Sequence, residues 1–185
     1  TGAQPQTVLN KLYKHTQLEE AFHYNMVALV DGVPQTLSLK AILEEYIKHR
    51  VEVIRRRTQF DLTKAEEREH ILLGLKKALD HIDAIIKLIR ASKDVPTAHA
   101  ALMKEFKFSE VQAQAILDMR LQKLAGLERK KIEEELREVQ ALIAELKTIL
   151  GSKKKMLTII KTELAEVAEK FGDDRRTKIV KGGVK

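Results

Sequence analysis

Residues 62–89 have the sequence LTKAEEREHILLGLKKALDHIDAIIKLI, in which apolar side chains recur at the spacing of a helical heptad. The steps between successive apolar positions are 3, 7, 3, 4, 3, 4 and 3 residues: Leu62, Ala65, Leu72, Leu75, Leu79, Ile82, Ile86 and Ile89. The helical pattern begins after Ser38, a favourable N-cap residue, and no proline occurs until Pro96. An unbroken helix of about 50 residues would span on the order of 75 Å, which is too long for a compact domain. The sequence therefore predicts a long helical arm, with a kink or a close helix crossing at Gly74.

A second heptad seam lies further along the chain and ends at Gly151. Its apolar positions are 4, 3, 4, 3 and 4 residues apart: Ile132, Leu136, Val139, Ile143, Leu146 and Leu150. Because each seam needs an apolar partner, we expect the two to pair as an antiparallel coiled coil. The second seam is the shorter, so segment 92–126 is expected to cover the end of the first one. A final helix follows and ends at Gly172, with apolar positions Leu157, Ile160, Leu164, Val167 and Phe171.

Segment 92–126 predicts a small helical head at the end of the arm. It contains a short helix from about Thr97 to Phe106, and then a capping box, Ser109 to Gln112, that opens a helix ending at Gly126. Two apolar rows lie on nearly opposite sides of that last helix, one formed by Leu117, Leu121 and Leu124 and the other by Ala115, Ile116 and Met119.

Two rows on one helix indicate two partners. We expect one row to pack into the head and the other to contact a second copy of the chain across a two-fold axis. The sequence does not show which row is which, so the candidate dimer contacts are Ala115, Ile116, Met119, Leu117 and Leu121. The alternative is that residues 97–108 bury both rows inside the head.

The first 37 residues carry the strand signals of the chain. Phe22–Val30 and Gln35–Leu37 flank the turn sequence Asp31–Pro34, which predicts a short β-hairpin, and a helix is expected over Thr7–Tyr13. The expected fold is mainly α, a long antiparallel coiled-coil arm with a small helical head and a hairpin at its base. The expected parts are residues 1–37 with the hairpin, 38–91 as the first limb, 92–126 as the head, 127–151 as the return limb, 152–172 as a final helix at the base and 173–185 as a basic tail.

Composition narrows the class of protein. A formal charge of +7 and a pI near 9.5 favour an anionic partner such as nucleic acid. The 4% of aromatic residues disfavours a large catalytic cleft, and the absence of Cys indicates a reducing compartment. No run approaches the roughly 20 apolar residues of a membrane span, and the N-terminus lacks a signal-peptide pattern. We therefore expect a soluble, cytoplasmic protein and, since the first residue is not Met, a piece of a longer polypeptide.

A basic cluster near the start of the arm is the candidate DNA-proximal site. It comprises Lys48, Arg50, Arg55, Arg56 and Arg57. Such residues can attract a duplex without regard to sequence. The alternative is a solvated face that pairs with Glu52, Asp61 and the acidic run 133–135, and the two interpretations are compatible.

Metal-site patterns are weak. Glu67–His70 has the E-x-x-H spacing of a di-iron helix, but such a site also needs two further Glu residues on facing helices, and an exposed charged helix face is the simpler interpretation. We therefore predict no metal site.

Three segments, in this order, resemble the A subunit of bacterial type IIA DNA topoisomerases, with DNA gyrase the closer likeness and topoisomerase IV the next. They are LYKHTQLEEAFHYNMVALVDGVPQTLSLKAILEEYIKHRVEVIRRRTQFDL (12–62), QAQAILDMRLQKLAGLE (112–128) and GDDRRTKI (172–179). The resemblance reaches to about Val180 and identifies the C-terminal part of the breakage-reunion region. It implies the end of the tower domain, a coiled-coil arm, and a knob whose contact with its twin forms the exit gate, or C-gate, for the transported duplex.

The resemblance also implies what the chain does not carry. The catalytic tyrosine of the family follows an arginine in an upstream winged-helix domain, and Tyr13, Tyr24 and Tyr46 lack that context. Mg and ATP belong to the B subunit of the whole enzyme, which is an ATP-dependent isomerase. We expect a homodimer through the head, a B-subunit partner and double-stranded DNA, with no catalytic residue, cofactor or activity in this piece alone. Gyrase and topoisomerase IV stay open, as do a basic coiled-coil arm that binds nucleic acid and a purely structural spacer.

Overall fold

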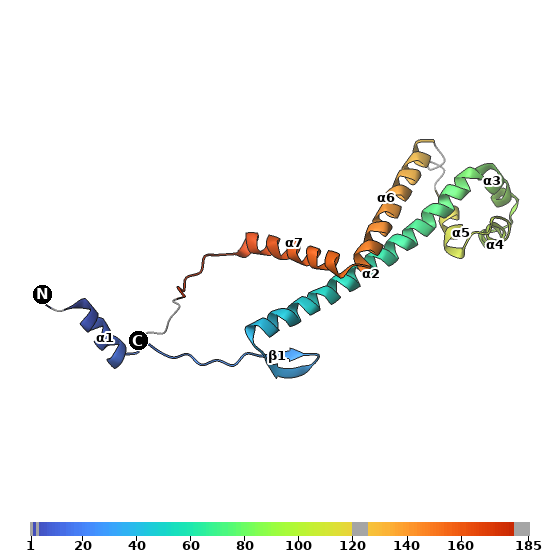
Figure 1. Cartoon of the computed structure of the whole chain (residues 1–185). Coiled ribbons are helices and arrows are strands. Elements are labelled where there is room, and N and C mark those ends of the chain that lie inside the picture. Colours follow the sequence, from blue (N-terminus) through green and yellow to red (C-terminus); the bar gives the residue numbers. More distant parts are fainter. Residues whose placement is uncertain (1, 3, 120–125, 180–185) are drawn as a thin grey trace. The chain divides into compact units, whose positions relative to one another are not determined.

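The computed structural model describes residues 2, 4–119 and 126–179 and has the mainly helical fold that the sequence predicts (Figure 1). The chain divides into two compact units, Thr1–Lys48 and His49–Lys185. Helix α2 (Leu39–Asp80) begins in the first unit and continues into the second. The first turn of α2 is capped as predicted, because the Ala41 N–H donates to Ser38 Oγ at 3.2 Å.

The first unit contains helix α1 (Pro5–His15) and a hairpin of strands β1 (Val27–Val30) and β2 (Val33–Thr36). The strands are antiparallel, with Val30 opposite Val33. Asp31 and Gly32 connect them with φ values of 51° and 81°, the pair of positive φ angles that a tight two-residue hairpin turn requires. The predicted hairpin is confirmed. None of the described residues of this unit is buried.

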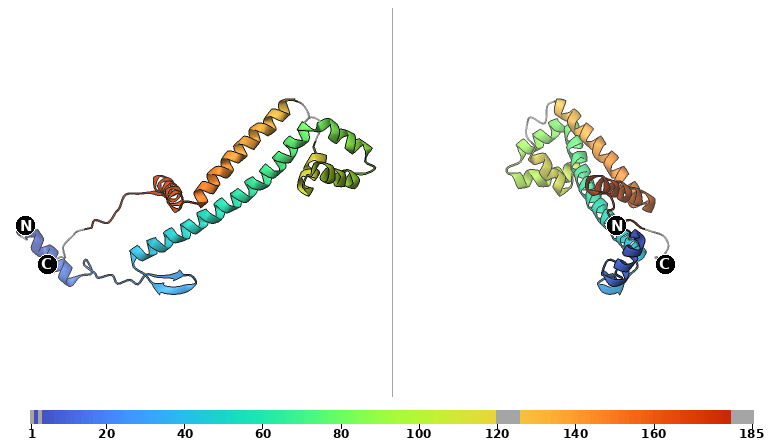
Figure 2. Two further views of the ribbon diagram at one scale, coloured as in Figure 1. Left: turned by 45° about the vertical axis from the view of Figure 1, so that its right-hand side comes forward. Right: turned by 90° about the vertical axis from the view of Figure 1, so that its left-hand side faces the viewer.

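The arm of the second unit is formed by α2 and helix α6 (Gly126–Leu150), which lie side by side in both views of Figure 2. Leu62 and Ala65 of α2 pack against Ile143 and Leu146 of α6. Nearer the head, a larger cluster continues the same seam with the side chains of Leu72, Leu75, Leu79, Ile132 and Leu136. The predicted pairing of the two seams is confirmed.

The first limb is not one helix to residue 91. Helix α2 ends at Asp80, His81 has non-helical backbone angles, and helix α3 (Ile82–Ala91) starts again after it. The predicted seam fails at this break, because Ile85 becomes the buried residue of α3 (1% exposed), whereas Ile86 is only half-buried. After the break, the chain therefore turns Ile85, and not Ile86, into the buried core.

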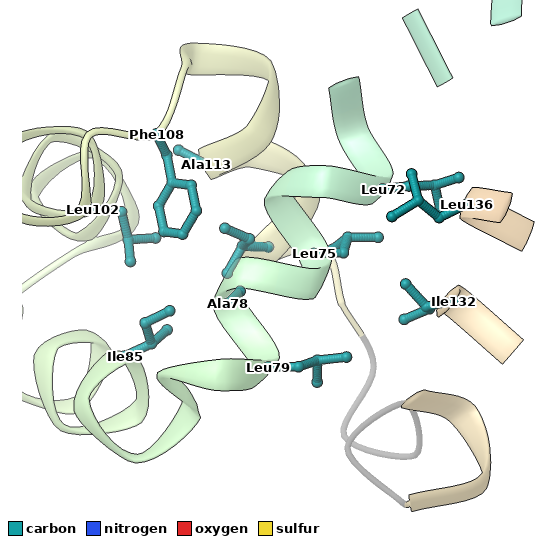
Figure 3. Close-up of a cluster of buried hydrophobic side chains, with 11 residues drawn as sticks. Leu72, Leu75, Ala78, Leu79, Ile85, Leu102, Phe108, Ala113, Ile132 and Leu136 are labelled. Carbon is teal, nitrogen blue, oxygen red and sulfur yellow. The ribbon is translucent and has the colours of Figure 1, made fainter. Parts of the chain in front are cut away.

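The head consists of α3, α4 (Val95–Phe106) and α5 (Glu110–Leu117). Figure 3 shows Ala78 of α2 directed toward Ile85 and Leu102 of the head, while Leu72 is directed toward α6. The predicted capping box at Ser109 and Gln112 opens α5.

The expected continuation of that helix to Gly126 is wrong. Helix α5 ends at Leu117, and the Met119 N–H bonds to Ile116 O at 3.2 Å, a short-range bond typical of a closing last turn. Gly126 is instead the first residue of α6. Leu121 and Leu124 lie outside the described residues.

Helix α7 (Lys153–Phe171) follows α6 after a capped turn at Ser152 and is closed at Gly172, as predicted. Met156 and Ile160 pack against Ile54 of α2. The rest of the predicted seam of α7 is solvent-facing, and Phe171 is 78% exposed.

Candidate functional site

Two of the predicted DNA-proximal cations converge on a single carboxylate of α7. Arg57 donates to Glu163 Oε1 at 2.7 Å, and Arg50 donates to the other oxygen of the same carboxylate. The hydrogen bond from Arg57, with the charge of Arg50 beside it, lowers the pKa of Glu163 below its usual range. The two arginines therefore help to hold α7 against α2.

The other three cations of the cluster also have acidic partners, within their own helix. Arg56 Nε lies 2.9 Å from Glu52 Oε1, and Arg55 lies 3.7 Å from the other oxygen of that carboxylate. Lys48 pairs with Glu45 at 2.5 Å, which raises the pKa of the lysine.

The structure thus brings the five cations into ion pairs, and one predicted partner, Glu52, is correct. Among the described contacts, Asp61 and residues 133–135 do not pair with the cluster; Glu135 binds Arg68 and Glu133 binds Arg129. Sequence reasoning missed Glu163, because it lies 106 residues from Arg57 and no local pattern joins them. Exposed pairs contribute under about 1 kcal/mol each, so a phosphate can compete for the cations.

The candidate dimer contacts on α5 differ in how deeply the head buries them. Ile116 is only 4% exposed and belongs to the core of the single chain, which leaves little of its side chain free for a second copy. Leu117 is half-buried against the same core. Ala113, which belongs to neither predicted apolar row, is also part of this core. Helix α5 therefore contacts the rest of the core on more than one side.

Val111 and Ala115 of α5 and Met119, just after its end, are spaced four residues apart. Val111 is 56% exposed, and Ala115 and Met119 are half-buried at the edge of the core. We call these three residues the head row. Sequence reasoning missed Val111 because it lies at the second position of α5, before the apolar repeat begins.

A shallow open groove of about 690 Å³ lies between α3 and α4 on the head. Its lining combines small or apolar side chains, such as Ala84 and Leu88, with charged ones, such as Lys87 and Glu105.

Metal-ligating and membrane-spanning features are both lacking within residues 2, 4–119 and 126–179. No group of three potential metal-ligating side chains occurs there. None of the helices in that part of the chain combines the length and apolar character that crossing a bilayer demands.

Comparison with known proteins adds an independent observation. The family model for the A subunit of DNA gyrase/topoisomerase IV matches residues 1–165. The chain is 58% identical over 172 residues to the DNA gyrase A subunit of Clostridium acetobutylicum, covering 93% of this chain and 21% of the relative. It is 54% identical over 177 residues to that of Halalkalibacterium halodurans (96% and 21%) and 51% identical over 181 residues to that of Staphylococcus aureus (98% and 20%). The chain therefore spans about a fifth of the length of these relatives.

Proposed function

Since the chain belongs to the family of DNA gyrase and topoisomerase IV A subunits, we propose that it is a non-catalytic part of an ATP-dependent type IIA DNA topoisomerase. Its head would form the C-gate contact with a second copy, through which the transported duplex leaves during DNA supercoiling. Relatives at 51–58% identity that are named as the A subunit of DNA gyrase favour gyrase. The topoisomerase IV A subunit, which acts in decatenation, is the alternative.

The observation that carries the gate proposal is the head row. The head already has its own core, to which Ile85, Leu102, Phe108 and Ile116 contribute. Val111 nevertheless remains 56% exposed on the outer side of α5. A self-complementary contact across a two-fold axis buries the same residues of both copies at once.

The basic cluster supports a secondary part of the proposal. Arg55 and Arg56 share one carboxylate, Glu52, and so leave an excess of positive charge on the arm. Exchange of Glu52 for a phosphate would give a weak, salt-dependent attraction that suits a duplex in transit.

The remaining parts of the enzyme follow from the family. In the whole protein the chain would join a B subunit that binds ATP and Mg, in the cytoplasm. This piece would contribute neither the catalytic tyrosine nor a cofactor site, and we expect it to be inactive alone.

Sedimentation velocity of the chain, with and without a short DNA duplex at physiological salt, tests the proposal. The gate contact predicts a dimer whose formation does not require DNA. A complex that forms only with DNA would favour a nucleic-acid-binding arm instead. A monomer under both conditions would favour a structural spacer and overturn the gate contact.

A further inference from the structure

Gly74 of α2 lies directly beneath the start of α5. It is buried, and a Cβ atom added there would lie 2.7 Å from Cγ and 2.9 Å from Cβ of Gln112. A side chain at this position would require Gln112 or one of the two helices to shift, so glycine permits the close crossing.

Gln112 uses this closeness to join the head to the arm. Its Nε2 donates to the backbone carbonyl of His70 at 2.7 Å, while its Oε1 accepts from the Ser109 N–H at 3.1 Å. Ser109 Oγ accepts from the Gln112 N–H and also lies 2.6 Å from Nε2 of His70. The cap of α5 is therefore hydrogen-bonded to α2 as well as to itself.

Lys77, about one turn further along α2 than Gly74, binds the C-terminal end of α4. Its ammonium donates to the carbonyl of Phe106 at 2.6 Å, and Phe106 is the last residue of α4, where carbonyls lack helical partners. The same ammonium lies 5.1 Å from the ring centre of Phe108. The ring of His81, a further turn on, lies 6.0 Å from that of Phe106.

The contacting residues of α2 are 4 and 3 positions apart and form one stripe: His70, Gly74 and Lys77. This stripe is distinct from the seam of Leu72, Leu75 and Leu79 that holds α6. We infer that the stripe, with Ser109 and Gln112, is a clamp on the α4–α5 corner that sets the orientation of the head on the arm. We call these five residues the corner clamp.

The functional consequence rests on the proposed function. If two heads must meet, the clamp positions the head row for its twin, and His70, Gly74 and Lys77 act through the head without touching the second copy. The arm and head then move as one body, because polar contacts at the corner supplement the apolar core.

The absence of Cys from the sequence makes a clean distance measurement possible. Spin labels would be placed on Cys substituted for Lys104 of α4 and for Glu138 of α6, both exposed. Labelled chain is mixed with a large excess of unlabelled chain, so that only the distance within one chain is observed. The variants are Gly74→Ala and Lys77→Met, and the control is Gly151→Ala, where an added Cβ would come no closer than 3.4 Å to its nearest neighbour.

We expect one narrow distance in the wild-type chain and in Gly151→Ala, and a shifted or broadened distance in Gly74→Ala. Lys77→Met, which adds no atoms at the crossing, should broaden the distance to a smaller degree while helix content is retained. In the same two variants the dimer dissociation constant should rise at least fivefold.

An unchanged distance in Lys77→Met, with Gly74→Ala either unchanged or unfolded, would overturn the clamp. A weakened dimer without any change in distance would also overturn it. The proposed function fails separately: a monomeric wild-type chain contradicts the gate contact, whereas the distance within one chain still tests the clamp.

Discussion

A charge placed at Ile116 of α5 should disrupt the head. Ile116 is 4% exposed within the head core, so Ile116→Asp would bury an unpaired carboxylate. We expect this change to unfold the head, and Ile116→Ala to lower the free energy of unfolding by about 2–5 kcal/mol. Urea titration followed by circular dichroism measures both. A folded, monomeric Ile116→Asp variant would instead indicate that Ile116 is a dimer contact.

Glu163 gives a residue-scale prediction that depends on pH. Its pKa is lowered, first by the hydrogen bond from Arg57 and also by the charge of Arg50. A carboxyl with a lower pKa in the folded state stabilises the fold above its unfolded pKa, and this stabilisation is lost as pH falls through the folded value. Because the group is partly exposed, Glu163→Gln should lower the free energy of unfolding by only about 1 kcal/mol at neutral pH.

The loss caused by Glu163→Gln should shrink as the pH falls below about 4.3, the ordinary pKa of Glu. Urea unfolding of the wild-type chain and the variant at neutral pH and at about pH 3 provides the comparison. A difference that is the same at both values would mean that the carboxylate charge contributes nothing.

At the scale of elements, the break at His81 gives a prediction that separates two adjacent isoleucines. Ile85 is 1% exposed in the head core, whereas Ile86, which the heptad pattern favours, is half-buried. Ile85→Ala should therefore cost about 3 kcal/mol of unfolding free energy, within the range for deletion of a buried side chain, and Ile86→Ala roughly 1 kcal/mol. Equal losses, or the reverse order, would indicate that the heptad continues through residue 86.

The same break shows what a sequence pattern can and cannot predict. The seam from Leu62 to Leu79 and its pairing with α6 follow from apolar spacing alone, and the capping box at Ser109 follows from its residue types. No glycine or proline marks His81, and α3 turns there because the head offers Ile85 a buried position.

The candidate site is predictable to the extent that local spacing governs it. Gly74 stands out in the sequence because glycine is unfavourable within a helix, and the structure resolves the choice in favour of a close crossing over a kink. The pairing of Arg56 with Glu52, four residues apart, is also local. The contact of Arg57 with Glu163 and that of Gln112 with His70 join elements that are far apart in the sequence. No local sequence pattern predicts them.

At the scale of the whole molecule, the basic cluster should make binding of a duplex weak and dependent on salt. Arg55→Gln combined with Arg56→Gln should reduce duplex affinity at low salt and lower the slope of log affinity against log salt by roughly one to two. Fluorescence anisotropy of a labelled duplex at several salt concentrations measures this slope. Lys153→Gln with Lys154→Gln removes the same charge from α7 and serves as the control; an equal effect would show that only net charge matters.

Sedimentation equilibrium of matched variants tests most directly whether the head row meets its copy in a second chain. Val111→Asp places a charge on the head row, while Leu142→Asp places one on an exposed apolar residue of α6, 45% exposed and away from the head. We expect the wild-type chain and Leu142→Asp to be dimers, and Val111→Asp to be a monomer with unchanged helix content. A dimer that survives Val111→Asp, or a wild-type chain that is monomeric at every concentration, would contradict the account.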